Sequence, residues 1–369
     1  MRYTSGMPSQ VLHTLFGEDV TAEIYRRLVP RFGIIAGKAL EKIQDTHRKA
    51  FALGCQGPDI FYHSQGRRPV GLEYGTLMHR RGAGIFTAGL LKMGLPDPPP
   101  DEEDIRMNRR EKGINALGAY ALGYMTHAIL DRQAHPYIVY KSERLVPESP
   151  GRFRYHAFFE RIIDVLMLKK LRNLDISSWD QDGLLAETCA NPPPGLKELL
   201  ARALVLAYPE RAGKDEKLGL RIENTFLDSA GFYHHTDPSR TPLHGATAII
   251  PSKNQVSYLF PGELPAEMDF LNLEHLPWYY PSGEKKEDLR SFPDIYSGAV
   301  CNAADTLTVI IEKYLEDGFF PIREAATAIG NGGLSVVDEN GKPCVVMRTD
   351  PLPLEEVLNQ QMVLRGVIN

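Results

Sequence analysis

The stretch from Gly123 to Tyr137 places two histidines and an aspartate, His127, Asp131 and His135, four residues apart within an otherwise apolar run. On an α-helix, residues four apart lie roughly 5–6 Å from each other on one face. Buried imidazoles and carboxylates are unfavourable unless they are hydrogen-bonded, paired or bound to a metal ion. The stretch therefore predicts a buried helix with one metal-binding face.

A second motif, His156-Ala-Phe-Phe-Glu160, follows in the chain and repeats this one-face spacing. Further candidate ligands come earlier in the chain. The full candidate set is His13, Asp59, His79, His127, Asp131, His135, His156 and Glu160. Imidazoles and carboxylates without thiolates suit Zn²⁺ or a similar divalent ion. The set is too large for one tetrahedral ion but sufficient for two or three ions, especially if one carboxylate bridges. Two-metal sites are well suited to hydrolysis of phosphate esters.

Taken singly, each of these residues has a purely structural explanation. His127 alone would be a hydrogen-bonded core histidine, Asp59 a turn or cap residue after Gly57-Pro58, and His79 an exposed residue beside two arginines. Their combination favours metal binding. Other histidines and aromatic residues near the motifs are expected to be peripheral, on the surface or packed in the core; these are His63, His234, His235, His244, Phe61, Tyr62 and Tyr74.

The composition is that of a soluble globular protein, with 43% hydrophobic and 24% charged residues. A formal net charge of −5 provides no overall attraction to nucleic acid or anionic membranes. The four cysteines are far apart and favour a reducing compartment. The N-terminal residues lack the apolar stretch of a secretory signal, and no long uninterrupted apolar run follows. We therefore expect a cytoplasmic protein.

Helical periodicity dominates the chain and predicts a mainly α fold. Helices are expected at residues 17–53, 76–93, 116–135, 153–171, 195–207, 217–226 and 296–315, and Pro136 is expected to end the third of these. Residues 234–295 are rich in Pro, Gly and aromatic residues and predict an irregular lid or wrap. Asn340-Gly341 lies between β-branched runs and predicts a small C-terminal β hairpin.

These patterns suggest four segments. Residues 1–233 would form a helical metal-binding core and residues 234–295 the irregular segment. Residues 296–329 would form a helix that packs on the core, and residues 330–369 a C-terminal extension with the hairpin.

The order of the motifs resembles the zinc-dependent phospholipase C family, which shares a multi-helical fold with the single-strand-specific zinc nucleases. The resemblance covers roughly residues 7–170 and depends on an isolated histidine, Gly57-Pro58-Asp59, a further histidine, HxxxDxxxH and HxxxE in this order. A lone HxxxD occurs by chance on many helices. The full order is specific.

The resemblance implies how the ligands are divided among ions. Asp59, His79, His127 and Asp131 would hold one ion, and His135, His156 and Glu160 a second. His13 would hold a third ion together with Asp131, which would then bridge. The family also uses an N-terminal tryptophan at the third ion, and this sequence has no such tryptophan. Either Met1 or a residue exposed by processing takes that place, or the third site is incomplete.

The activity implied is metal-dependent hydrolysis of a phosphate diester, in which two or three Zn²⁺ ions activate water and Asp59 is the general base. A phospholipid substrate would bring transient contact with a membrane surface. The alternatives are a nuclease of the same fold, which the acidic charge balance disfavours, and a non-catalytic helical module whose metals stabilise the fold. The headgroup and the oligomeric state stay open.

Overall fold

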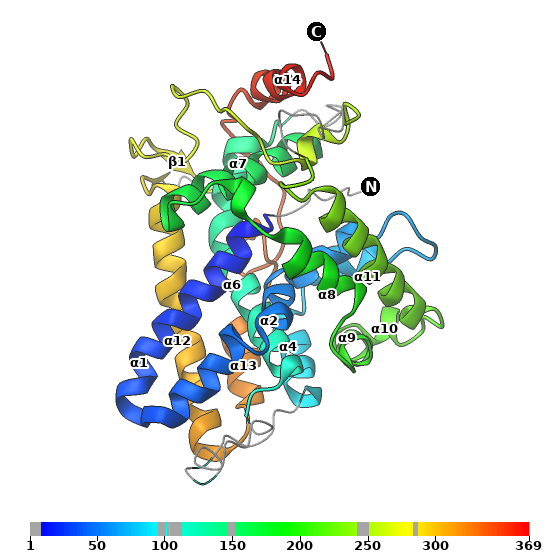
Figure 1. Cartoon of the computed structure of the whole chain (residues 1–369), viewed down its shortest axis with the longest axis vertical. Coiled ribbons are helices and arrows are strands. Elements are labelled where there is room, and N and C mark those ends of the chain that lie inside the picture. Colours follow the sequence, from blue (N-terminus) through cyan, green and yellow to red (C-terminus); the bar gives the residue numbers. More distant parts are fainter. Residues whose placement is uncertain are drawn as a thin grey trace.

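The structure is a computed structural model that describes residues 9–94, 101, 103, 113–145, 152–241, 251–282 and 287–368. Helices dominate it, which confirms the mainly α fold (Figure 1). The α-helices are α1 (Val11–Gln44), α2 (Arg48–Cys55), α3 (Leu72–Arg80), α4 (Ala83–Met93), α6 (Ala116–Ser142), α7 (Arg152–Arg172), α8 (Glu187–Ala190), α9 (Leu196–Ala207), α10 (Pro209–Ala212), α11 (Leu218–His235), α12 (Phe292–Asp317), α13 (Ile322–Ile329) and α14 (Leu354–Leu364). Short 3-10 or π turns are η1 (Gly57–His63), η2 (Ile176–Ser178), η3 (Asp182–Ala186) and η4 (Val256–Tyr258).

Helix α6 lies at the centre of this arrangement. It packs against α2 on one side and against α1 and α12 on another, and α12 runs alongside α1 (Figure 1). Helix α7 also contacts α6. The central position explains why α6 is apolar over most of its circumference, since almost every side chain from Gly118 to Leu130 is buried.

Helix α6 continues past Pro136 to Ser142, so the prediction that this proline ends the helix is wrong. A proline inside a helix costs about 3 kcal/mol. Tertiary packing outweighs this, because the turn after the proline is buried: the ring of Tyr137 lies 5.4 Å from that of Trp278 and 5.5 Å from that of Phe292. The extension matters for the site, because it carries Ser142.

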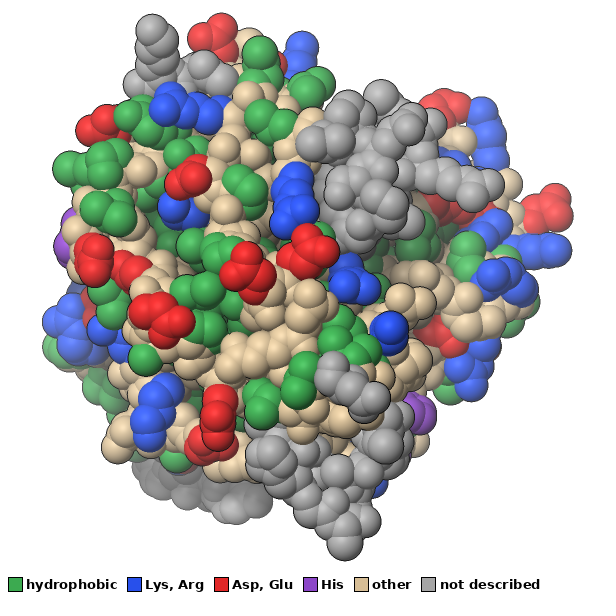
Figure 2. All heavy atoms as spheres, turned by 90° about the horizontal axis from the view of Figure 1, so that it is seen from above, with side chains coloured by type: hydrophobic (Ala, Val, Ile, Leu, Met, Phe, Trp, Pro, Cys, Tyr) green, Lys and Arg blue, Asp and Glu red, His purple; other side chains and the backbone are tan. Residues whose placement is uncertain are grey.

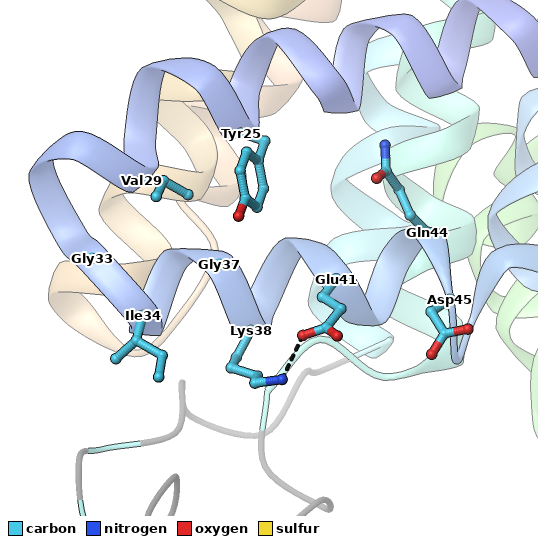
Figure 3. A pocket seen from close by; sticks show the side chains of 9 residues that line it. All are labelled: Tyr25, Val29, Gly33, Ile34, Gly37, Lys38, Glu41, Gln44 and Asp45. Atoms are coloured by element: carbon cyan, nitrogen blue, oxygen red, sulfur yellow. Dashed lines mark hydrogen bonds and ion pairs between the residues drawn. The ribbon is translucent and has the colours of Figure 1, made fainter.

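The single helix expected over residues 17–53 is divided. Gly33, with φ 57° and ψ −137°, makes a kink inside α1, and residues 45–47 separate α1 from α2. The positive φ is accessible to glycine without steric strain. The two arms of α1 lie beside each other and leave a surface groove of about 660 Å³ (Figure 3). Its lining contains none of the eight candidate ligands: it is formed by Tyr25, Val29, Gly33, Ile34, Gly37, Lys38, Glu41, Gln44 and Asp45.

The β structure differs in place from the sequence prediction. An antiparallel pair, β1 (Trp278–Tyr279) and β2 (Glu287–Asp288), lies within the segment expected to be irregular, with Trp278 opposite Asp288. The predicted C-terminal hairpin is present as a tight turn at residues 338–341 with one bridge between Val337 and Pro343. The C-terminal extension also contains α14, a helix that was not predicted from the sequence.

Helix α11 extends to His235, so His234 and His235 end a helix and do not begin the irregular segment. His244 lies outside the described residues. Within the described part of the chain, no helix is both long and apolar enough to cross a membrane. The division into four segments stays a prediction.

Candidate metal centre

The close approach of α2 and α6 brings the first metal-binding residues together. A Cβ atom at Gly54 would lie 2.2 Å from the backbone oxygen of Tyr120, and one at Gly123 would lie 2.4 Å from that of Phe51. Both positions therefore require glycine. The two backbones in contact place the carbonyl of the last residue of α2 next to the first histidine of the α6 motif.

Gly57 allows a similar close approach, here between the turn that carries Asp59 and the ring of His127. It has a φ of 54°, and a Cβ atom there would lie 2.3 Å from Cδ2 of His127. The η1 turn can thus pass directly over the imidazole. Asp59 is buried on this turn, with Oδ2 3.7 Å from Nε2 of His127 and Oδ1 2.8 Å from Nε2 of His79.

Asp131 is at the centre of the cluster. Its Oδ2 lies 3.2 Å from Nε2 of His127 and 3.5 Å from Nε2 of His79. Its Oδ1 lies 3.3 Å from Nε2 of His13 and 3.5 Å from Nε2 of His135. One carboxylate therefore faces four imidazoles, with two on each oxygen.

Glu160 on α7 completes the other end of the cluster. Its Oε1 lies 3.5 Å from Nε2 of His156 and 3.7 Å from Nε2 of His135. His135 thus faces both Asp131 and Glu160. The cluster is a continuous array that runs from α1 and η1 through α6 to α7.

The opposite nitrogens of three imidazoles define their tautomers. Nδ1 of His127 donates to the carbonyl oxygen of Cys55 at 3.0 Å, and Nδ1 of His79 donates to that of Gly75 at 2.8 Å. The hydroxyl of Ser142 donates to the carbonyl of Ile138, so it accepts from Nδ1 of His156 at 3.3 Å. Metal ligation requires the neutral imidazole, which carries one proton; with that proton on Nδ1, each Nε2 presents a lone pair.

Lone pairs of imidazole and carboxylate that face each other repel unless a cation lies between them. Several of these atoms are buried and lack a hydrogen-bond partner among the described residues: both oxygens of Asp59, Nε2 of His127, Oδ2 of Asp131 and Oε2 of Glu160. Unpaired buried polar atoms of this kind need an explanation, and a bound ion is one. The residues present therefore fit a metal centre.

The pKa shifts have the same origin. Burial would raise the pKa of Asp131, but His127 and His135 hold it well below its ordinary value. Burial lowers the pKa of His135 to about 4, against the charge of Asp131. Burial raises the pKa of Glu160 to about 7, although His156 opposes this shift. Burial opposes protonation of His13 too, but Asp131 raises the pKa above its ordinary value.

The candidate ligands form three groups, and within each group the ligand atoms lie within 4.8 Å of one another; every candidate ligand belongs to at least one group. The groups are His13 with Asp59 and His127, His79 with His127 and Asp131, and His135 with His156 and Glu160. The third group has the composition expected from the resemblance. The structure also places His13 against Asp59 and His127, with the His13 and His127 rings stacked at 4.2 Å. Which residue binds which ion stays a prediction.

The residues that orient the ligands were not among the site residues predicted from the sequence. Tyr62, expected to be packing, has its hydroxyl 2.9 Å from Nδ1 of His79 and its ring stacked on that imidazole. Ser335 has its hydroxyl 3.2 Å from Nδ1 of His135. The position of Tyr62 beside the Gly-Pro-Asp turn was a usable signal. No sequence signal pointed to Ser335, which is remote in the chain.

The other histidines lie outside the cluster. His63 is buried and has Nδ1 3.3 Å from the hydroxyl of Ser229, while His234 pairs with Asp182 on the surface. Phe260 and Trp278, which lie in the segment expected to be an irregular lid or wrap, are 4% and 2% exposed and therefore cover the core.

The fold and the site together define a mainly α protein with a buried histidine and carboxylate metal centre. The family model described as zinc dependent phospholipase C matches residues 32–193, which confirms the resemblance to that family over this region. The match includes seven of the candidate ligands and leaves His13 outside. Comparison with curated proteins and with solved structures gave no match. The family and the three ligand groups support a zinc-dependent hydrolase with two or three Zn²⁺ ions as its cofactor.

Proposed function

We propose that this protein hydrolyses phosphate diesters at the metal centre built around Asp131. The observation that carries the proposal is the sharing of one carboxylate, whose Oδ1 and Oδ2 face different pairs of imidazoles. Ions held on the two sides of a bridging carboxylate lie close together. Paired ions suit a phosphate diester because they polarise its oxygens, lower the pKa of the attacking water and stabilise the departing oxygen.

Asp59 is the proposed general base. Its carboxylate is 1% exposed and faces His79 and His127 in the same cluster. A carboxylate held at the edge of the phosphate site is placed to accept the proton of the attacking water. Solvent and substrate would reach that water from the side of His79 and His135, whose side chains are 10% and 13% exposed. The side chains of His13, His127 and Asp131 are more deeply buried, with 4% or less exposed.

A catalytic role is favoured over a purely structural one by the number of ligands. Structural zinc sites are closed by four protein side chains, whereas catalytic sites keep an open position. Each of the three ligand groups among the described residues consists of three side chains, and the one formed by His135, His156 and Glu160 has the most exposed histidine, with 13% of the His135 side chain accessible. An ion there would have room for water or substrate.

The diester is proposed to be a phospholipid, in line with the family matched by residues 32–193. Leu273, Leu276 and Leu289, close to the β1–β2 pair, are 51%, 54% and 50% exposed and would make transient contact with a membrane surface. Acidic and basic side chains are interspersed on the face shown in Figure 2. The net charge of −5 likewise favours a lipid over nucleic acid, which usually binds a basic stripe. The cytoplasmic location stays a prediction.

The test is turnover of bis(p-nitrophenyl) phosphate by zinc-loaded protein. We expect activity that chelation abolishes and Zn²⁺ restores, and that falls roughly 10²- to 10⁴-fold in Asp59→Asn. Asp175→Asn is the matched control, since Asp175 is an exposed residue that caps the short η2 turn. A folded, zinc-loaded protein that is inert toward diesters, phospholipid vesicles and single-stranded DNA would overturn the proposal. Cleavage of DNA but not of lipid would establish the nuclease alternative.

A further inference from the structure

Arg132, the residue after Asp131, holds a segment that comes from the far end of the chain. Its guanidinium donates to the backbone carbonyl of Ile329, to that of Gly330 at 3.3 Å, to that of Gly332 at 3.2 Å and to that of Gly333 at 3.1 Å. Four carbonyls on one guanidinium use most of its donor capacity. The segment is thus attached to α6 directly beside Asp131, the carboxylate at the centre of the cluster.

The same segment contacts two candidate ligands. The N–H group of Leu334 donates to the carbonyl oxygen of His79 at 2.8 Å, and the hydroxyl of Ser335 lies 3.2 Å from Nδ1 of His135. Contacts of one segment with His79 and His135 connect two of the three ligand groups. We call residues 329–335 the clamp segment. It lies outside the region that matches the family.

Ser335 completes a pattern that the other imidazoles establish. His79, His127 and His156 each direct Nδ1 at an oxygen of Gly75, Cys55 or Ser142, and each turns Nε2 toward a carboxylate. For His135 the corresponding oxygen is the hydroxyl of Ser335. A hydroxyl that accepts from Nδ1–H leaves the Nε2 lone pair directed at Asp131 and Glu160.

We propose that Ser335 is a positioning residue of the metal centre, which orients His135 toward the ion shared with His156 and Glu160, and that Arg132 holds the clamp segment in place for this contact. The proposal rests on the proposed function only in so far as this centre binds metal. Loss of a partner that orients a ligating imidazole typically weakens metal binding 10- to 100-fold.

The experiment measures Zn²⁺ affinity by competition with a chromogenic chelator, together with zinc content per chain. Ser335→Ala should weaken one class of ion about 10- to 100-fold, and Ser335→Thr, which keeps the hydroxyl, should restore it. Thr327→Ala is the matched control, because Thr327 is an exposed residue of neighbouring α13 that bonds within its own helix. Wild-type zinc affinity in a folded Ser335→Ala would overturn the proposal.

Two further variants keep the test decisive. In a His156→Ala background that has lost the same ion, Ser335→Ala should have no further effect on the remaining ions; an added loss of equal size would contradict the assigned ligand group. Arg132→Lys should weaken the same ion as Ser335→Ala. Unchanged affinity there would remove the role of Arg132. If wild-type protein binds zinc and hydrolyses no diester, the proposed function fails while the effect of Ser335→Ala on zinc affinity still decides this inference.

Discussion

Replacing Asp164 by alanine should destabilise the protein by about 3–5 kcal/mol. Asp164 is fully buried on α7 and accepts from the hydroxyl of Ser9, from the backbone N–H groups of Gln10 at 3.0 Å and Leu12 at 2.8 Å, and from Nη1 of Arg161 at 3.1 Å. Asp164 therefore caps the N-terminus of α1 and neutralises the guanidinium of Arg161, a residue that is 1% exposed.

The magnitude follows from what the substitution leaves behind. An N-cap contributes about 1 kcal/mol, whereas a buried charge without its partner costs about 3–5 kcal/mol. The two effects share one carboxylate and are not additive, so the larger one sets the expectation. The guanidinium of Arg161 retains a bond to the carbonyl of Tyr258 and lies over the ring of Phe260, but neither contact supplies negative charge.

The assay is urea unfolding of the metal-free protein followed by circular dichroism. Asp175→Ala, which removes an exposed cap, should change the free energy of unfolding by about 1 kcal/mol or less. The double variant Arg161→Met/Asp164→Leu should recover part of the loss, because no charge then stays buried. A destabilisation below about 1 kcal/mol for Asp164→Ala would refute the reasoning.

Three further outcomes are expected. Gly57→Ala should lower zinc content and diester turnover, because the new Cβ atom would overlap the ring of His127. In the control Gly219→Ala the new Cβ atom would have no neighbour within 4 Å, so this variant should stabilise α11 by up to about 1 kcal/mol. Equal effects of the two variants on zinc content and on urea unfolding would contradict this expectation. Burial lowers the pKa of His63 to about 3, so the folded state binds fewer protons, and stability present above pH 6.5 is lost as pH falls toward 3. The urea midpoint of the metal-free protein should therefore fall less between about pH 7 and about pH 5 in His63→Gln than in the wild type. An equal fall in both proteins would exclude His63 as the cause of the acid destabilisation. Chelation should lower the urea midpoint of the zinc-loaded protein, since bound ions stabilise the folded state by mass action, and an unchanged midpoint would argue against metal binding.

The parts of the fold that the sequence predicted are local ones. Most helices lie close to their predicted positions, because apolar periodicity and helix geometry act within a few turns. The prediction of a single helix over residues 76–93 is wrong, since the chain breaks there into α3 and α4 at Gly82, which has a φ of 81°. The errors came where distant residues intervene. Pro136 was expected to end α6, and burial of Tyr137 against Trp278 and Phe292 keeps the helix intact.

The sequence by itself determined which residues share a face in the metal centre. Spacing of four places His127, Asp131 and His135 along α6, and His156 with Glu160 along α7, because the α-helix repeats every 3.6 residues. Only the tertiary structure decided which nitrogen faces which carboxylate. It also brought Ser335 to His135 and Leu334 of the clamp segment to His79, contacts between residues 200 and 255 positions apart along the chain. Such contacts depend on packing between segments, and helical periodicity carries no information about them.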